Sequence, residues 1–268
     1  MACGYSFPLF VPADRPERFA AACAADTDSV VIDIEDAIAP ESKAAVRRIP
    51  QSALPETRDV RLFLRINGPR TAWHNDDVSF VRATEYFDGV MLPKTDNAAQ
   101  VAHLRAGLGR DCAVIALIET AAGLAQVEEI AAVADRLAFG SIDFCEDLSC
   151  ANTVQTLLPV RSRIVLASRL AGRPAPLDGV TLAHDDAAQV TAEALHACQM
   201  GFGGKLLIHP RQIAPARAGF LPDPAQVEWA RRIVAVAGGG ALSVQGEMVD
   251  RPVVARARRI LQRAESPP

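Results

Sequence analysis

The chain has 268 residues, of which half are apolar and 22% are charged, and its formal net charge at pH 7 is −4. A chain of this length can bury one complete core, and a single α/β barrel of about 250 residues is a common size. No apolar run approaches the roughly 18 consecutive residues that a membrane span needs, so we expect no membrane protein. The interspersed charges argue against a nucleic-acid surface but are compatible with a small anionic ligand.

The cysteines are scattered along the chain and form no C-x-x-C pair. They are Cys3, Cys23, Cys112, Cys145, Cys150 and Cys198. Such thiols are typical of small reduced hydrophobic residues in a cytosolic protein. Residues 1–18 carry neither a basic leader nor a long apolar segment, so we expect no secretory signal. We therefore predict a cytoplasmic location.

Apolar runs of strand length alternate with stretches of helical periodicity. The expected strands are Ser6–Pro12, Ser29–Asp36, Arg61–Asn67, Gly89–Lys94, Ala113–Thr120, Arg136–Phe144, Leu177–Thr181 and Lys205–His209. The expected helices are Pro16–Ala25, Glu41–Ile49, Asp77–Tyr86, Asn97–Leu108, Ala121–Asp135, Thr153–Ala171, Asp185–Met200 and Pro224–Ala237. Parallel strands with crossover helices follow from this alternation, and eight such units close into a TIM (β/α)8 barrel. A doubly wound open sheet is the alternative, but no G-x-G-x-x-G segment follows the first strand.

The C-terminal part of the chain begins with a glycine run, Gly238–Gly240, that is typical of a linker. Beyond it we expect a short polar segment and a basic helix at Pro252–Ala264. The linker would let this tail swing over a neighbouring barrel. The sequence thus predicts a barrel over residues 1–237 and, over residues 238–268, a helical extension that acts as a lid.

The central stretch, Ala113–Phe144, is a strand–helix–strand unit in which each expected strand ends in a carboxylate, Glu119 or Asp143. Carboxyl ends of parallel strands meet at the same edge of a barrel, where active sites lie. Two carboxylates at one mouth suit Mg²⁺, which takes one or two protein oxygens and keeps its other positions for water and substrate. We therefore predict that Glu119 and Asp143 hold a magnesium ion.

Other expected strand ends are also polar, and several admit two interpretations. Glu35 and Asp36 follow the second strand and would lie behind the metal ligands, with Asp36 hydrogen-bonding a metal-bound water. Alternatively, Asp36 caps the helix that starts near Pro40. Lys94 and His209 also follow strands, where solvated or locally paired side chains are equally compatible with the sequence.

Arg65 is the only guanidinium at an expected strand end. Its planar fork suits a substrate carboxylate or a developing enolate oxygen. The other interpretation is an ion pair with Glu35 or Asp36 that neutralises the acidic mouth, and the two roles are compatible.

Several segments resemble the citrate lyase β-subunit-like enzymes of the HpcH/HpaI aldolase superfamily. They are FVPADRPERF at 10–19, VVIDIEDAIAPESKAAVR at 30–47, LRIN at 64–67, VMLPK at 90–94, IETAAGL at 118–124, LAFGSIDF at 137–144, MGFGGKLLIHPRQI at 200–213 and GEMVDRPVVARARRIL at 246–261. These segments span nearly the whole chain in the order of the family. The resemblance implies a TIM barrel, dependence on Mg²⁺, and cleavage or formation of carbon–carbon bonds in β-hydroxyacyl thioesters.

The same resemblance assigns residues. It makes Glu119 and Asp143 the metal ligands and Arg65 a catalytic, substrate-contacting residue. It makes Asp250 an acid/base group that reaches an active site from the lid of a neighbouring subunit. From the sequence alone, Asp250 is instead the N-cap of the helix at Pro252–Ala264.

We accordingly expect a lyase that cleaves citryl-, malyl- or citramalyl-CoA into an α-keto acid and an acyl thioester. The thioester carrier would be coenzyme A or an acyl-carrier protein, whose phosphates Arg15 and Lys43 would contact. The same groups would also serve a synthase or a thioesterase. An aldolase acting on free hydroxy-keto acids, with His209 as base, and a non-catalytic thioester-binding subunit are further alternatives. We expect a homo-oligomer, trimeric or larger.

Overall fold

A computed structural model describes residues 5–49, 53–55, 58–236, 242–244 and 247–265. Eight parallel strands follow one another in sequence order around one sheet. They are β1 (Leu9–Pro12), β2 (Ser29–Asp33), β3 (Arg61–Arg65), β4 (Gly89–Leu92), β5 (Ala113–Ile118), β6 (Arg136–Phe139), β7 (Leu177–Asp178) and β8 (Gly204–Lys205). The residues after β8 return to β1, where Phe10 N–H donates to the Leu207 carbonyl at 2.8 Å and closes the sheet. The predicted (β/α)8 barrel is confirmed.

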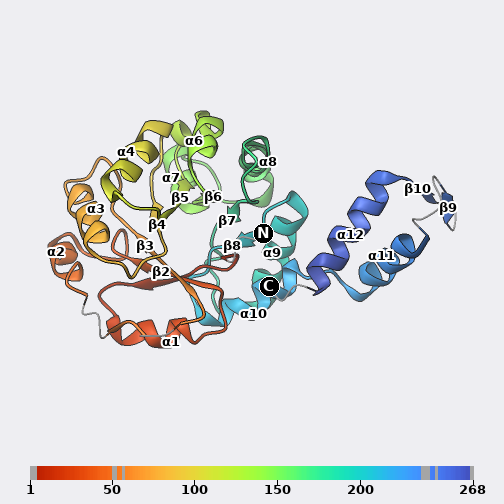
Figure 1. The fold of residues 1–268 in the computed structure, drawn as a ribbon, viewed down its shortest axis with the longest axis horizontal. Helices are drawn as coiled ribbons and strands as arrows, with labels where there is room; N and C mark the ends of the chain where they lie inside the picture. Colours follow the sequence, from red (N-terminus) through yellow and green to blue (C-terminus); the bar gives the residue numbers. More distant parts are fainter. Residues whose placement is uncertain (1–4, 50–52, 56–57, 237–241, 245–246, 266–268) are drawn as a thin grey trace.

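Helices surround the barrel (Figure 1). They are α1 (Phe19–Cys23), α2 (Lys43–Val46), α3 (His74–Ala83), α4 (Ala98–Leu108), α5 (Ala121–Ala125), α6 (Val127–Val133), α7 (Ser141–Leu148), α8 (Val154–Leu170), α9 (Ala187–Met200) and α10 (Ile213–Phe220). Short 3-10 turns precede three of them, at Pro16–Arg18, Pro40–Ser42 and Pro210–Gln212. The sequence did not predict α7 or α10. The apolar residues that open α7 continue the apolar run of β6, so the periodicity did not separate the two elements.

Most strands end earlier than we predicted. β2 stops at Asp33 rather than Asp36, and β6 stops at Phe139 rather than Phe144. The polar residues after each strand bend away from the sheet and form the rim of the barrel. The carboxyl-end loops, more than the strands themselves, therefore carry the chemistry of the mouth.

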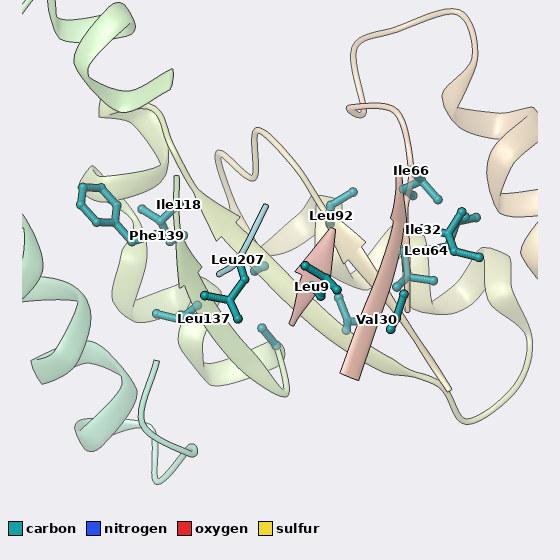
Figure 2. Packing of buried hydrophobic residues seen from close by; sticks show 14 of the residues in the cluster. Leu9, Val30, Ile32, Leu64, Ile66, Leu92, Ile118, Leu137, Phe139 and Leu207 are labelled. Atoms are coloured by element: carbon teal, nitrogen blue, oxygen red, sulfur yellow. The ribbon is translucent and has the colours of Figure 1, made fainter. Parts of the chain in front are cut away.

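Two apolar layers hold the barrel together. One lies between strands and helices, where Val30, Ile32 and Leu64 project from the outside of the sheet (Figure 2). The other fills the interior, as expected for a barrel of this size. It consists of Tyr5, Val31, Phe63, Met91, Ile115, Leu117, Ala138, Leu177 and Leu206. Because side chains fill the centre, a ligand can enter only at the ends of the strands.

A C-terminal arm projects from the barrel beyond α10 (Figure 1). It contains α11 (Pro224–Val236), β9 (Leu242–Val244), β10 (Glu247–Val249) and α12 (Arg251–Glu265). Ala230 and Ile233 of α11 pack on Ala257 and Ile260 of α12, in an apolar cluster separate from the barrel core. The described part of the arm thus has a small apolar core of its own, and the expected division between residues 237 and 238 stays a prediction. The role of the arm as a lid stays a prediction.

Candidate active site

A pocket of about 320 Å³ opens at the carboxyl end of the barrel and is lined by both expected metal ligands, Glu119 and Asp143. Its wall also contains Arg65, from the end of β3. The rest is largely apolar: Phe10, Pro12, Leu117, Phe139, Ile142, Val180, Leu206 and Ile208. Glu119 and Asp143 also line a second cavity, together with Lys94 and Arg70. The carboxylate pair thus borders both spaces.

The I-E-T segment explains how Glu119 is held. β5 ends at Ile118, and Thr120 caps the helix that follows by accepting a hydrogen bond from Gly123 N–H at 2.9 Å. Between them, Glu119 points into the site and is only 2% exposed. The Lys94 backbone N–H donates to Glu119 Oε1 at 2.7 Å and fixes one carboxylate oxygen.

Asp143 lies near the first turn of α7 and not at a strand end, so the sequence-based placement was wrong. It nevertheless reaches the same mouth, because α7 starts directly after the short β6. The turn between them requires Gly140, since a Cβ there would lie 2.6 Å from Glu119 Cβ. Glycine at this position lets the two acidic residues approach each other.

Lys94 lies at the centre of the acidic groups, a position that sequence reasoning missed. Its ammonium Nζ is 3.3 Å from Asp143 Oδ2 and 4.0 Å from Glu119 Oε1. The same atom is 2.5 Å from Glu35 Oε1 and 3.4 Å from Asp36 Oδ2. Four carboxylates therefore converge on one cation. The only signal in the sequence was that Lys94 follows an expected strand.

Arg65 forms ion pairs with Glu35 and Asp36, as the second interpretation of its sequence position predicted. Its main partner, however, is Asp33, with Nε to Oδ1 at 2.8 Å and Nη2 to Oδ2 at 2.6 Å. Arg65 Nη1 is also 3.1 Å from Glu35 Oε2, and the guanidinium lies over the Phe10 ring at 5.0 Å. Asp36 is the most exposed acid of the group and lies 4.0 Å from Arg65. Arg65 is thus held in place with part of its fork facing the pocket.

Burial and crowding of charge shift the pKa values at the mouth. The pKa of Glu119 is raised to about 8, chiefly because burial disfavours its charged form and also because Asp143 repels a second negative charge. Burial likewise raises the pKa of Glu35 to about 6, against the opposing effect of Arg65. Burial acts to lower the pKa of Lys94, but its hydrogen bond with Glu35 and the surrounding carboxylates raise it above its usual value. Lys94 therefore stays positively charged, whereas the neighbouring cations do not fully offset the cost of a buried negative charge on Glu119.

These residues fit a divalent cation. Glu119 and Asp143 supply oxygen donors around one point, the point that the Lys94 ammonium approaches. The described residues contain no group of three or more histidine, cysteine, aspartate or glutamate side chains placed to hold a metal ion, so the site would rest on these two carboxylates. An ion at this point would take oxygens from the pair and leave its other positions to water and substrate, as Mg²⁺ does in proteins. The assignment of both acids as ligands stays a prediction.

Lys43 does not have the role that we predicted. It is 6% exposed, and its Nζ donates to Asn67 Oδ1 at 2.6 Å and to the Glu35 carbonyl at 2.8 Å. Its hydrogen bonds are directed inward, so it is not available to an external phosphate. It instead supports the loop that carries Glu35. Arg15 remains exposed at the rim, 4.0 Å from Asp14.

Asp250 and His209 lie outside the pocket lining. Asp250 caps α12, where its Oδ1 accepts from Val253 N–H at 3.1 Å, as the sequence alone indicated. The N-terminal end of α12 lies at the far end of the arm, away from the barrel (Figure 1). His209 caps the turn at Pro210–Gln212 and accepts from Arg211 N–H at 3.1 Å. Neither contacts the acidic pair of its own barrel.

Fold and site together define an α/β barrel whose mouth, at the carboxyl ends of the strands, is lined by acidic side chains. The chain belongs to the HpcH/HpaI aldolase/citrate lyase family, which it matches over residues 6–210. It is 39% identical to a citrate lyase subunit beta-like protein of Mycobacterium tuberculosis, with 96% of this chain and 94% of the relative covered. It is 32% identical to a (3S)-malyl-CoA thioesterase of Cereibacter sphaeroides, with 96% and 94% covered.

A solved structure has the same fold over nearly the whole chain. It is protein CitE of Mycobacterium tuberculosis in complex with magnesium, acetoacetate and coenzyme A, with a TM-score of 0.88 and 36% identity. The match covers 99% of this chain and 100% of that chain. The family predicted from the sequence is confirmed.

Proposed function

We propose that the protein is a Mg²⁺-dependent carbon–carbon lyase that cleaves a β-hydroxyacyl thioester into an α-keto acid and an acyl thioester. The observation that carries this proposal is the convergence of Glu119 and Asp143 on one cation position beside Arg65. The family supports it, because the related CitE protein was solved with magnesium, acetoacetate and coenzyme A.

Glu119 and Asp143 would hold the ion. When bound, Mg²⁺ supplies a Lewis acid that lowers the pKa of a hydroxyl next to a carboxylate. Arg65 faces the pocket and stabilises the negative charge that develops on oxygen during cleavage. The apolar wall formed by Leu117, Val180 and other residues limits the water around that charge.

The base that accepts the hydroxyl proton is proposed to be Asp250 of another copy of the chain. The bond between the carbinol carbon and the neighbouring methylene then breaks, and its electron pair passes into the thioester enolate. Protonation of that enolate yields the acyl thioester and leaves the α-keto acid. The position of α12 on a projecting arm is compatible with a contribution to a second barrel (Figure 1).

An assay for keto-acid release tests the lyase. Citryl-, malyl- and citramalyl-CoA are supplied with Mg²⁺, and free hydroxy-keto acids are supplied in parallel. We expect keto acid only from a thioester, and loss of about 10³-fold or more in the Glu119→Gln variant because a metal ligand is removed. Keto acid released only from the free hydroxy-keto acids would favour the aldolase instead.

Asp250 is tested by mixing two inactive variants. Asn caps a helix as well as Asp does, so Asp250→Asn should fold normally while losing activity. If Asp250 acts on a neighbouring barrel, mixed oligomers of Asp250→Asn and Glu119→Gln regain part of the activity. Full activity of Asp250→Asn alone would show that it only caps α12.

A thioesterase is the second candidate function, and the Cereibacter sphaeroides relative favours it. In that case free coenzyme A appears from the thioester without an equal amount of keto acid. Measuring thiol and keto acid in the same reaction separates the two activities. We further propose that the thioester carrier is coenzyme A or an acyl-carrier protein. The proposal also includes a homo-oligomer that is trimeric or larger and a cytoplasmic location. No helix in the described part of the chain is long and apolar enough to cross a bilayer.

A further inference from the structure

The most unusual feature of the mouth is the position of the Lys94 ammonium. It is within 4.0 Å of the two proposed metal ligands, Glu119 and Asp143, and closer still to Glu35. Magnesium binds its oxygen ligands at about 2.0–2.1 Å. An ion held by both acids would therefore lie close to this ammonium. Two cations so close together would repel each other strongly.

The backbone at Lys94 has an unusual conformation that fixes the Glu119 carboxylate. Its φ is 48°, in the left-handed region that a side chain of this kind rarely adopts. This conformation accompanies the hydrogen bond from Lys94 N–H to Glu119 Oε1. The backbone therefore anchors one acid independently of where the long side chain points.

The Lys94 side chain has space into which it can move. It is 40% exposed and lines the second cavity, beside Arg70, Asp96 and Glu146. The acidic side chains there can receive a cation, and the flexible four-carbon stem can turn toward them. Moving the ammonium does not require the backbone hydrogen bond to Glu119 to break.

We propose that Lys94 is a positioning residue that occupies the cation position in the metal-free protein, and that the divalent ion displaces its ammonium into the second cavity. The proposal rests on the proposed function only in assuming that Glu119 and Asp143 hold the ion. In the metal-free protein, Lys94 keeps two mutually repelling carboxylates close together. Magnesium carries two positive charges where the ammonium carries one, and it can bind both carboxylates directly. The exchange of the ammonium for the ion is therefore favourable.

The first test is Mg²⁺ titration by calorimetry of the wild type and of Lys94→Met. Removing the ammonium that competes with the ion should tighten binding by roughly ten-fold or more. The substitution should also lower the Tm of the metal-free protein. Saturating Mg²⁺ should reduce the difference in Tm between the wild type and Lys94→Met. Lys94→Arg keeps a competing cation and should bind Mg²⁺ about as weakly as the wild type.

Arg70→Met is the matched control. Arg70 lines the same cavity but pairs with Asp96 at 2.8 Å and not with the proposed ligands, so its removal should change Mg²⁺ affinity by less than about two-fold. Equal or weaker binding by Lys94→Met overturns the proposal. If the wild type binds no Mg²⁺ at all, the proposed function fails instead, so the two failures are distinguishable.

A second test uses the wild-type protein and does not depend on whether a variant folds. The chain contains three lysines, and the other two, Lys43 and Lys205, are 6% and 1% exposed. Reductive methylation followed by peptide mass spectrometry therefore reports Lys94 against two buried references. Release from the four carboxylates should raise the Lys94 labelling rate by about three-fold or more when Mg²⁺ is added. An unchanged or slower rate overturns the proposal.

Discussion

Two clusters of charged side chains lie on the barrel, and they differ in the ratio of carboxylates to cations. The mouth cluster consists of Asp33, Glu35, Asp36, Arg65, Lys94, Glu119 and Asp143. The seam cluster lies behind β7 and β8 and consists of Arg161, Asp178, Glu193 and Lys205. Five carboxylates face two cations in the first cluster, whereas two face two in the second. Only the mouth cluster therefore has a deficit of positive charge.

This difference separates a binding site from a structural contact. Lys205 is 1% exposed, and its Nζ is 3.5 Å from both Asp178 Oδ2 and Glu193 Oε2 and donates to the Gly179 carbonyl at 2.6 Å. Its charge is matched within the protein. At the mouth the carboxylates outnumber the neighbouring cations, which supports the proposed binding of a cation there. Perturbed, unmatched charge in a pocket is typical of functional sites.

Among the variants that compare the two clusters, the largest expected effect comes from removing the arginine of the mouth cluster. Arg65→Met should lower kcat/KM by about 10²–10³-fold, because the oxyanion loses its fixed donor. It should also cost about 3 kcal/mol of stability, since Asp33 and Glu35 lose a buried partner. Steady-state assays and urea unfolding measure the two effects. A folded Arg65→Met protein with wild-type activity would contradict the assignment.

Removing a cation of the seam cluster should change stability alone. Lys205→Met leaves Glu193 and part of Asp178 unpaired and should cost about 3 kcal/mol. For a chain of this size the Tm would fall by roughly 6–12 °C. The kcat measured well below that temperature should stay unchanged. Loss of kcat with an intact Tm would mean that the seam cluster takes part in the reaction.

Gly140→Ala tests the mouth cluster by moving one acid without removing a charge. A Cβ at residue 140 would lie 2.6 Å from Glu119 Cβ, so the carboxylate must shift. We expect Mg²⁺ affinity to fall by about ten-fold, because magnesium tolerates little departure from its preferred geometry. Gly68→Ala is the control, since its Cβ would meet Lys94 Cδ at 3.7 Å in ordinary contact. Similar affinities for both variants would argue against Glu119 as a ligand.

The smallest effect is expected at the rim. Arg15 is exposed and lies 4.0 Å from Asp14, so Arg15→Gln should leave the Tm unchanged. If Arg15 meets the phosphates of the thioester carrier, KM should rise by about two- to three-fold and should depend on ionic strength. An unchanged KM at low salt would remove Arg15 from the substrate-binding residues.

Much of the fold was predictable from local pattern. The strand order, the position of Glu119 and the cap provided by Asp250 follow from apolar runs, strand ends and capping residues. These features depend on neighbours close in the sequence, which single-sequence reasoning handles well. The meeting of Glu119 and Asp143 at one mouth was also predicted from the expected strand ends, and the family resemblance supported it.

Other features depend on contacts between distant segments. Lys94 lies among acids that come from three other strand ends or loops, and nothing in its local sequence indicates that convergence. The sequence predicts that Lys43 contacts a phosphate, but its side chain turns inward because Asn67 and the carbonyl of Glu35 supply acceptors. The packing of α11 on α12 was likewise not visible, because both helices show ordinary amphipathic spacing.

The short strands β7 and β8 have a consequence for how new specificities could arise. Each has two residues, and β6 joins β7 through one residue pair, Ala138 with Leu177. Val180 and Leu206, which flank these strands, line the pocket beside Arg65 but not the second cavity that Lys94 lines. Substitutions along this lightly bonded edge can reshape the space for the substrate side chain while leaving the ion ligands untouched. Evolution toward bulkier acids would therefore begin there.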